Sequence, residues 1–350
     1  MANIILTGGG TAGHCIPHLA ILPHLKGKFD NIYYVGSENG IERSIIEKTD
    51  IKYYHIPCAK LNRNLTAKNL KIPFSVLCGI IKANKLIDEL KPNVIFSKGG
   101  YVSLPLVIAA KNKNVPVIAH ESDYTIGLAN KISAKYCKLV LTSFPDTAKQ
   151  INNGKFVGSP IRRIASSSAK KDYSYFGFDG NKPILLVTGG SLGAKALNDA
   201  VRSALDDLLA KFDVIHLCGK NNLIKNPPNK GYYQAEFLSE IDKAYNCASV
   251  CVSRAGSNTL FEMMSIKMPC VLIPLPKGAS RGDQILNANY FQRLGLAYNL
   301  PQENLTKESL IFAINSTYAN RYNLNHAFNS HSISDASKEI AKIIIENAKP

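Results

Sequence analysis

The sequence predicts an α/β protein with two doubly wound, Rossmann-like domains that face each other across a cleft. Short apolar segments rich in β-branched residues alternate with helical patterns along nearly the whole chain, as in parallel sheets covered by helices on both faces. A glycine-rich turn follows the first such segment of each half, at 8–13 and at 189–194. The chain has 350 residues, which is too long for one compact core.

Nine segments are predicted to be strands, because they are mostly uninterrupted apolar runs of strand length. In chain order they are 3–7, 31–35, 93–97, 116–120, 138–142, 183–188, 213–217, 249–253 and 269–274. Helical periods lie between them, and the clearest is formed by Leu197, Val201, Leu205 and Leu208. Ligands of such sheets bind at the carboxyl ends of the strands, so the turns after the strands are the candidate sites.

A polar, Gly/Ser-rich stretch at 166–183 is the predicted linker zone. We therefore expect a first domain over 1–160 and a second over 161–333. The final segment, 334–350, carries an apolar stripe of Ile340, Ile343 and Ile344, and we expect it to form a helix that packs back onto the first domain.

The formal net charge is +16, which favours an anionic partner: a nucleic acid, a phosphorylated metabolite or an anionic lipid surface. No aromatic cluster interleaved with arginines is evident, so no nucleic acid is expected. The N-terminus runs directly into a strand, without a secretion signal, and no stretch has the length of a membrane-spanning helix. Eight scattered cysteines without paired spacing indicate free thiols in a reducing cytosol.

The first glycine turn fits the pattern G-x-G-x-x-G at Gly8, Gly10 and Gly13, which brings phosphate close to backbone amides at a helix start. The pattern alone is weak, because it also fits a tight turn or a dehydrogenase with Glu38 as its ribose-binding acid. A dehydrogenase leaves the second glycine turn unexplained. His14 follows the turn, where an imidazole with a pKa of about 6.5 can accept a proton, although a lone histidine often only packs or caps.

Other strand ends carry polar residues that would meet at the same edges. Glu121 follows a first-half strand and is either an acid of the cleft or a residue that starts a helix. In the second half, 257–259 would begin a helix and offer amides and hydroxyls to phosphate, while Glu262 would chelate the vicinal hydroxyls of a ribose. Gln284 stands at another helix start.

Seven motifs in this order resemble the MurG family of bacterial cell-wall glycosyltransferases: GGGTAGHCIPHLA, KGGYVSLP, HESD, GSPIR, GGSLGAKALN, SRAGSNTLFE and DQILNA. They span roughly residues 3–300. The resemblance implies the two-domain GT-B fold. It also implies a hexosyltransferase that moves N-acetylglucosamine from UDP-N-acetylglucosamine to a lipid-linked muramyl-pentapeptide at the cytoplasmic face of the cell membrane.

The resemblance also implies a set of site residues. His14 would be the catalytic base, and Glu262 would bind the ribose, Leu238 the uracil and Gln284 the donor sugar. The residues implied to contact the donor are Thr11, Ala12, Gly13, Asp123, Arg162, Ser191, Leu238, Ser257, Asn258, Thr259, Leu260, Phe261, Glu262 and Gln284. Two positions depart from the family, which usually has glycine at Ala12 and asparagine at Asp123. Asp123 adds a negative charge close to where the donor is expected.

The implied reaction inverts the α-linked donor sugar to a β-linked product by direct displacement. His14 would take the proton of the acceptor's 4-hydroxyl, and helix N-termini, loop amides and Arg162 would stabilise the leaving UDP. No Asp-x-Asp is placed for a bridging metal, so we expect neither a metal nor another cofactor.

The region 60–85 is expected to attach to an anionic membrane surface. Basic residues there surround apolar ones, and no acidic residue occurs over 51–87, which suits an interfacial segment. The same pattern fits a solvated basic face over a core helix. Two other functions stay open at this point: a non-hydrolysing UDP-sugar epimerase, and a non-catalytic sugar-nucleotide-binding scaffold at the membrane.

Overall fold

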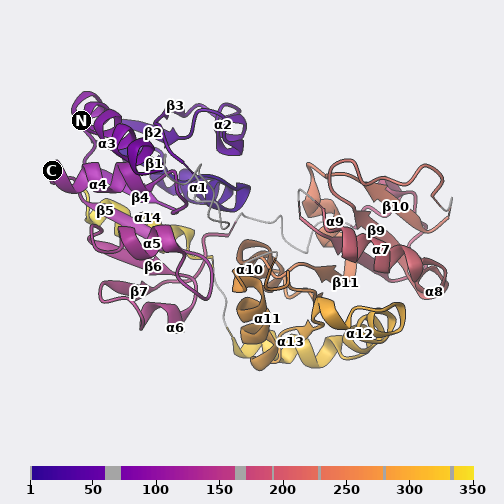
Figure 1. The fold of residues 1–350 in the computed structure, drawn as a ribbon. Helices are drawn as coiled ribbons and strands as arrows, with labels where there is room; N and C mark the ends of the chain where they lie inside the picture. The colour runs from indigo at the N-terminus through magenta and orange to yellow at the C-terminus, as the bar shows by residue number, and fades with distance from the viewer. Residues whose placement is uncertain are drawn as a thin grey trace. The chain divides into compact units, whose positions relative to one another are not determined.

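The computed structural model divides the chain into two compact units (Figure 1). The first comprises Met1–Arg163 with Ser334–Pro350, and the second comprises Ile164–Ile333. The structure describes residues 2–59, 72–161, 171–190, 193–227, 230–278, 281–331 and 335–350. Each unit is an α/β sandwich around a parallel sheet, which confirms the predicted fold class.

The sheet of the first unit has seven parallel strands in the order β3-β2-β1-β4-β5-β6-β7. Ile5 in the inner strand β1 pairs with Tyr33 of β2 on one side and Ile95 of β4 on the other. The strands are β1 (Asn3–Thr7), β2 (Asn31–Gly36), β3 (Lys52–His55), β4 (Val94–Ser97), β5 (Val117–Glu121), β6 (Leu139–Thr142) and β7 (Gly154–Phe156).

Helices cover both faces of this sheet because alternate side chains of its strands are apolar on both sides. Ile4 and Leu6 of β1 pack with α1, α2 and α14, whereas Ile5 packs on the opposite face with α3 and α4. The helices are α1 (Ala12–Leu25), α2 (Ile41–Ile46), α3 (Ile72–Leu90), α4 (Leu104–Asn112), α5 (Leu128–Ser133), α6 (Pro145–Ala148) and α14 (Ser337–Glu346).

Helix α14 belongs to the first unit although it lies at the far end of the sequence (Figure 1). Its Ile340, Ile343 and Ile344 are buried in the core that also contains residues of α1. Backbone contacts fix both ends of this segment: the Ala336 N–H donates to the Ser159 carbonyl at 3.2 Å, and the N–H of Lys349 donates to the carbonyl of Asn93 at 2.9 Å. The apolar stripe seen in the sequence is therefore the buried face of this helix.

The sheet of the second unit has six parallel strands in the order β10-β9-β8-β11-β12-β13. They are β8 (Ile184–Thr188), β9 (Asp213–Leu217), β10 (Tyr232–Ala235), β11 (Ala248–Ser253), β12 (Cys270–Leu272) and β13 (Tyr298–Asn299). The helices are α7 (Lys195–Ser203), α8 (Leu205–Lys211), α9 (Ile241–Cys247), α10 (Ser257–Ser265), α11 (Asp283–Arg293), α12 (Lys307–Ala319) and α13 (Arg321–Ser330), with 3-10 turns η2 (Ser174–Phe176) and η3 (Gln302–Asn304).

The helical period at 197–208 is split into two helices. Ala204, whose ψ of 3° is not helical, separates the end of α7 from the start of α8. The apolar side chains of both helices nevertheless pack into one core, so the periodicity reports the buried face and not the continuity of the helix. None of the helices in the described part of the chain combines the length and apolarity needed to span a membrane.

Candidate active site

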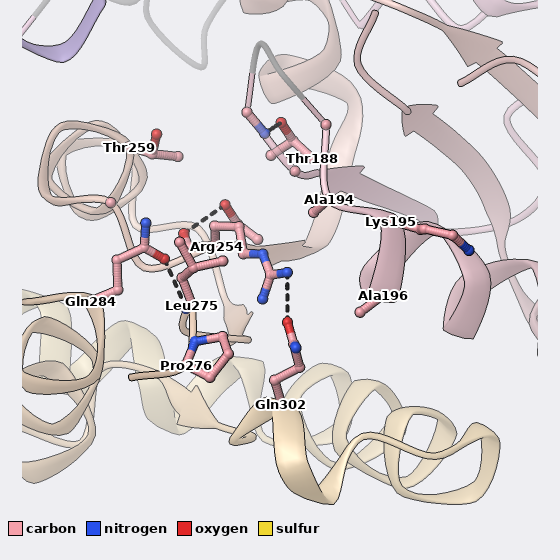
Figure 2. Close-up of a pocket in the computed structure, with 15 residues that line it drawn as sticks. Thr188, Ala194, Lys195, Ala196, Arg254, Thr259, Leu275, Pro276, Gln284 and Gln302 are labelled. Carbon is pink, nitrogen blue, oxygen red and sulfur yellow. Dashed lines mark hydrogen bonds between the residues drawn. The ribbon is translucent and has the colours of Figure 1, made fainter. Parts of the chain in front are cut away.

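A hollow of about 540 Å³ lies at the carboxyl ends of β8, β11 and β12 in the second unit (Figure 2). This is the edge at which doubly wound sheets bind ligands. Its lining residues are Thr188, Gly189, Gly190, Gly193, Ala194, Lys195, Ala196, Ser253, Arg254, Gly256, Thr259, Leu275, Pro276, Gln284 and Gln302.

The second glycine turn forms one wall of this hollow. Gly190 and Gly193 have φ of 84° and 75°, a left-handed conformation that favours glycine. A Cβ on Gly193 would lie 2.3 Å from the carbonyl oxygen of Cys218, so only glycine fits there. Ser191, implied by the family resemblance to contact phosphate, lies outside the described residues, and so does Arg162.

Arg254 places a cationic side chain in the hollow and was missed in the sequence. Its Nη1 donates to the carbonyl of Ile273 at 3.0 Å and its Nη2 donates to Oε1 of Gln302 at 2.7 Å (Figure 2). Burial lowers the pKa of Arg254 from its ordinary value, but a guanidinium remains charged at neutral pH. The sequence could have indicated this residue, because Arg254 directly follows the buried strand β11.

Helix α10 begins at this hollow, where its N-terminal amides and positive dipole end favour an anion. Thr259 lines the hollow and Ser257 is buried at the helix start. Leu260 and Phe261 are buried in the core, so their side chains pack inside the unit and only their backbone remains for a ligand. Ala12–Gly13 and the neighbouring residues belong to the other unit.

Two further predicted residues accept hydrogen bonds within the second unit, and of these only Gln284 lines the hollow. Oε2 of Glu262 accepts a hydrogen bond from the Tyr245 hydroxyl at 3.3 Å. Oε1 of Gln284 accepts from the backbone N–H of Leu275 at 3.0 Å, which orients the side-chain amide at the edge of the hollow (Figure 2). Leu238 is buried, belongs to the connection from β10 to α9, and does not line the hollow. Asn258 lies in the first turn of α10.

In the first unit, two glycine turns pack backbone against backbone at the carboxyl ends of β1 and β4. A Cβ on Gly100 would lie 2.3 Å from the carbonyl oxygen of Gly9, and one on Gly10 would lie 2.6 Å from the Tyr101 ring. Gly10 and Gly100 also have φ of 87° and 81°. Glycine is therefore required here by close approach as well as by conformation.

A buried carboxylate that sequence reasoning missed holds the first glycine turn. Glu42 is fully buried, and it accepts hydrogen bonds from the N–H groups of Gly10 at 3.2 Å and Ser37 at 3.0 Å and from the Ser37 hydroxyl at 2.5 Å. The Glu42 carboxylate thus accepts a hydrogen bond from the N–H of Gly10. In dinucleotide-binding turns, such a backbone amide donates to a bound phosphate. This arrangement disfavours the dehydrogenase reading of G-x-G-x-x-G.

His14 lies in the first turn of α1, beside the two glycine turns. Its Nδ1 is 3.1 Å from Oγ1 of Thr11, the residue that precedes the helix. A Cβ on Gly100 would approach Nδ1 of His14 to 3.4 Å, so the ring packs against the second turn. Gly13 belongs to the same helical turn, as does Ala12, whose side chain lies outside the described part.

Glu121 ends strand β5 and does not start a helix, contrary to one of the two roles considered for it; its carboxylate holds the loop that follows the strand. Its carboxylate accepts from the N–H groups of Asp123 at 3.1 Å and Gly127 at 2.9 Å and from Nδ2 of Asn130 at 2.9 Å. These contacts close the loop 121–127 onto the start of α5. The loop that carries Asp123 is therefore well fixed to the end of β5.

The chain matches known glycosyltransferases over both units. The model of the glycosyltransferase family 28 N-terminal domain matches residues 4–142, and that of the C-terminal domain matches residues 184–344. The chain belongs to glycosyltransferase family 28. The predicted resemblance to MurG is thereby confirmed, because a Clostridium botulinum (strain Hall) protein is 45% identical over 354 residues, covering 100% of both chains. That protein is named UDP-N-acetylglucosamine–N-acetylmuramyl-(pentapeptide) pyrophosphoryl-undecaprenol N-acetylglucosamine transferase.

Solved structures agree on the architecture. MurG of Acinetobacter baumannii matches with a TM-score of 0.78 and 25% identity, covering 99% of this chain and 100% of that one. A UDP-GlcNAc 2-epimerase from Methanocaldococcus jannaschii matches with a TM-score of 0.64 and 14% identity, covering 99% and 100% of the two chains. The fold is therefore shared by transferases and an epimerase, and sequence similarity separates them.

Proposed function

We propose that this protein transfers N-acetylglucosamine from UDP-N-acetylglucosamine to the 4-hydroxyl of a lipid-linked muramyl-pentapeptide, a step of peptidoglycan synthesis. The observation that carries this proposal is the 45% identity, over the full length of both chains, to a transferase named for these substrates. The epimerase alternative rests on a match of 14% identity. The scaffold alternative is separated from the transferase by the test below.

The donor is expected to bind in the hollow of the second unit. Its diphosphate suits the glycine turn at 189–193, the N-terminal amides of α10 and the guanidinium of Arg254. Glu262 is proposed to bind the ribose hydroxyls and Gln284 the sugar. We propose that Leu238 contacts the uracil and that Ser191 and Arg162 contact the phosphates.

The chemistry proposed for the first unit is general base catalysis by His14. The ring takes the proton of the acceptor's 4-hydroxyl while that oxygen attacks the anomeric carbon and the bond to UDP breaks. Charge then develops on the leaving diphosphate, where the fixed donors of the second unit stabilise it. Thr11, Ala12, Gly13 and Asp123 are proposed to meet the donor from this side. No step requires a metal.

Helix α3 supports the proposed membrane attachment. Phe74, Leu77 and Ile81 are 71%, 55% and 52% exposed, and their spacing puts them on one face of the helix. Lys85 is exposed on the same helix. Residues 60–71 of the proposed region 60–85 lie outside the described part. We propose that this face lies on anionic lipid at the cytoplasmic side of the membrane.

The proposal is tested by incubating the purified protein with labelled UDP-N-acetylglucosamine and a lipid-linked muramyl-pentapeptide. We expect a labelled lipid-linked disaccharide, formed equally well in EDTA and in magnesium. Formation of UDP-N-acetylmannosamine without acceptor would instead identify an epimerase. Donor binding without any product would identify the scaffold.

A further inference from the structure

A carboxylate is buried beneath the glycine turn that leads into helix α1. Glu42 lies in the first turn of α2 and is fully buried. Removing a carboxylate from water is unfavourable unless other groups compensate. The neighbouring cation, Arg43, pairs with Glu47 at 2.8 Å. The compensation for Glu42 therefore comes from the hydrogen bonds that its two carboxylate oxygens accept.

The surrounding backbone is shaped to receive this carboxylate. A Cβ on Gly9 would lie 2.5 Å from Oε1 of Glu42, and a Cβ on Gly40 would collide with the same atom. Oε1 accepts from the N–H and the hydroxyl of Ser37, which follows strand β2. Oε2 accepts from the N–H of Gly10 at 3.2 Å. One oxygen thus anchors the side chain to the end of β2, and the other holds the glycine turn.

The amide that Glu42 holds is next to the residue that orients the proposed base. Gly10 directly precedes Thr11, whose Oγ1 lies 3.1 Å from Nδ1 of His14. The carbonyl of Thr11 also accepts from the backbone N–H of His14 at 3.1 Å. Thr11 therefore contacts both the ring and the backbone of His14, so a shift of Gly10 would move the ring as well.

The second glycine turn supports the same ring and has an anchor of its own. A Cβ on Gly100 would lie 3.4 Å from Nδ1 of His14. This turn follows Lys98, which is 2% exposed. The Nζ of Lys98 lies 2.6 Å from Nδ1 of His120 and 2.6 Å from Oγ of Ser122. Of the two turns beside the ring, the first is thus the one that the buried carboxylate holds.

We propose that Glu42 is a positioning residue for sugar transfer and sets the place of the His14 base through Gly10 and Thr11. This inference rests on the proposed function. Because it is buried, Glu42 acts through the turn and not on the substrates. A displacement of about 1 Å is enough to slow a reaction by about 100-fold. Loss of the contact with Gly10 should therefore lower the rate of transfer and leave donor binding in the second unit unchanged.

The test is a double-mutant cycle between Glu42 and His14 on the full chain. E42Q keeps the size of the side chain, but the one oxygen of an amide cannot replace both carboxylate oxygens. We expect E42Q to lower the single-turnover rate of transfer by about 10- to 100-fold, with the Kd for UDP within about twofold of wild type. In the H14A background, E42Q should lower the remaining rate by less than about twofold, because the ring that Glu42 positions is absent.

The matched control is E47Q. Glu47 lies at the end of α2, is 52% exposed and forms the surface ion pair with Arg43. Its replacement should change the transfer rate by less than about twofold in either background. An equal loss from E42Q with and without His14 would overturn the inference, because a merely structural carboxylate affects both backgrounds alike. An undiminished rate in E42Q would overturn it too.

If E42Q does not fold, E42D carries the same cycle. It keeps the charge but withdraws the carboxylate from Gly10 by one methylene, so the transfer rate should again fall only where His14 is present. An equal loss in both backgrounds, or no loss, would overturn the inference. A wild-type protein that forms no disaccharide would refute the proposed function itself. An active wild type without coupling between the two residues would refute only the role of Glu42.

Discussion

Oγ1 of Thr11 lies 3.1 Å from Nδ1 of His14, so the residue that precedes helix α1 holds the ring that follows it by one turn. The contact orients the imidazole through one nitrogen. Thr11 stands at the end of a glycine turn that Glu42 holds in place. The position of the His14 ring is therefore set by the turn that follows strand β1. A general base needs this kind of fixed geometry more than a shifted pKa.

Replacing His14 by alanine is expected to slow sugar transfer by about 10²–10⁴-fold, the usual contribution of a general base. The Kd for UDP should change little, because the proposed donor hollow belongs to the other unit. Single-turnover transfer and equilibrium titration measure the two effects. His24→Ala, an exposed position near the end of α1, is the matched control. Full turnover in the His14 variant would remove this residue as the base.

Glu262→Ala is expected to weaken UDP binding by about tenfold or more, because a charged acceptor for two ribose hydroxyls is lost. Binding of 2′,3′-dideoxy-UDP, which lacks those hydroxyls, should be hardly affected. Calorimetric titration with both nucleotides measures the difference. Asp206→Asn, on helix α8 of the same unit, serves as the control. Equal losses for both nucleotides would place Glu262 away from the ribose.

Changing Phe74, Leu77 and Ile81 together to serine is expected to abolish most binding to vesicles of phosphatidylcholine with phosphatidylglycerol. These side chains are the apolar part of the proposed interfacial face. Co-sedimentation measures the bound fraction, and Lys82→Glu with Lys85→Glu should weaken it further. Phe312→Ser removes another exposed aromatic ring, 63% exposed on helix α12, and should leave binding intact. Unchanged sedimentation of the triple variant would contradict the membrane face.

Acidification is expected to destabilise the first unit more steeply than the second. Burial lowers the pKa of His18 to about 3 and that of His216 to about 4, and it lowers the pKa of His120 well below 6.5. Below about pH 6.5 these histidines bind protons in the unfolded chain but not in the folded chain. The free energy of unfolding therefore decreases as the pH is lowered. Each such histidine costs about 1.4 kcal/mol per pH step.

Urea unfolding between neutral and mildly acidic pH measures this dependence. The first unit contains two of these three buried histidines, His18 and His120. Its free energy of unfolding should therefore fall with decreasing pH about twice as fast as that of the second unit. His18→Gln should reduce the slope by one proton, whereas His24→Gln, at an exposed position, should leave it unchanged. A slope that is the same in all three proteins would show that His18 is protonated in the folded state.

The fold was readable because buried parallel strands are continuous apolar runs. All nine predicted strands are present, and the four that were missed, β3, β7, β10 and β13, are short or lie at or near the edges of their sheets. An edge strand such as Lys52–His55 has polar and aromatic side chains without a long apolar run. The break at Ala204 was also missed, since a helix kinked around a core keeps its apolar period.

The site was predictable only where chemistry follows a strand directly. Thr259 and Gln284 line the hollow, and their contacts with a donor stay a prediction. Glu42, Lys98 and Arg254 were missed because their roles depend on partners distant in sequence: Glu42 holds an amide 32 residues away, and Lys98 reaches groups 22 and 24 residues away. A buried charge that is stabilised by contacts distant in sequence leaves no local sequence pattern.

The return of helix α14 to the first unit has a consequence for biosynthesis. The strands of both sheets are translated before α14. The apolar side chains of α1 that pack against this helix therefore stay uncovered until translation reaches Ile340, Ile343 and Ile344. The first unit is thus expected to complete its folding after the second unit. A nascent chain stalled before residue 335 should be protease-sensitive in its earliest-made half.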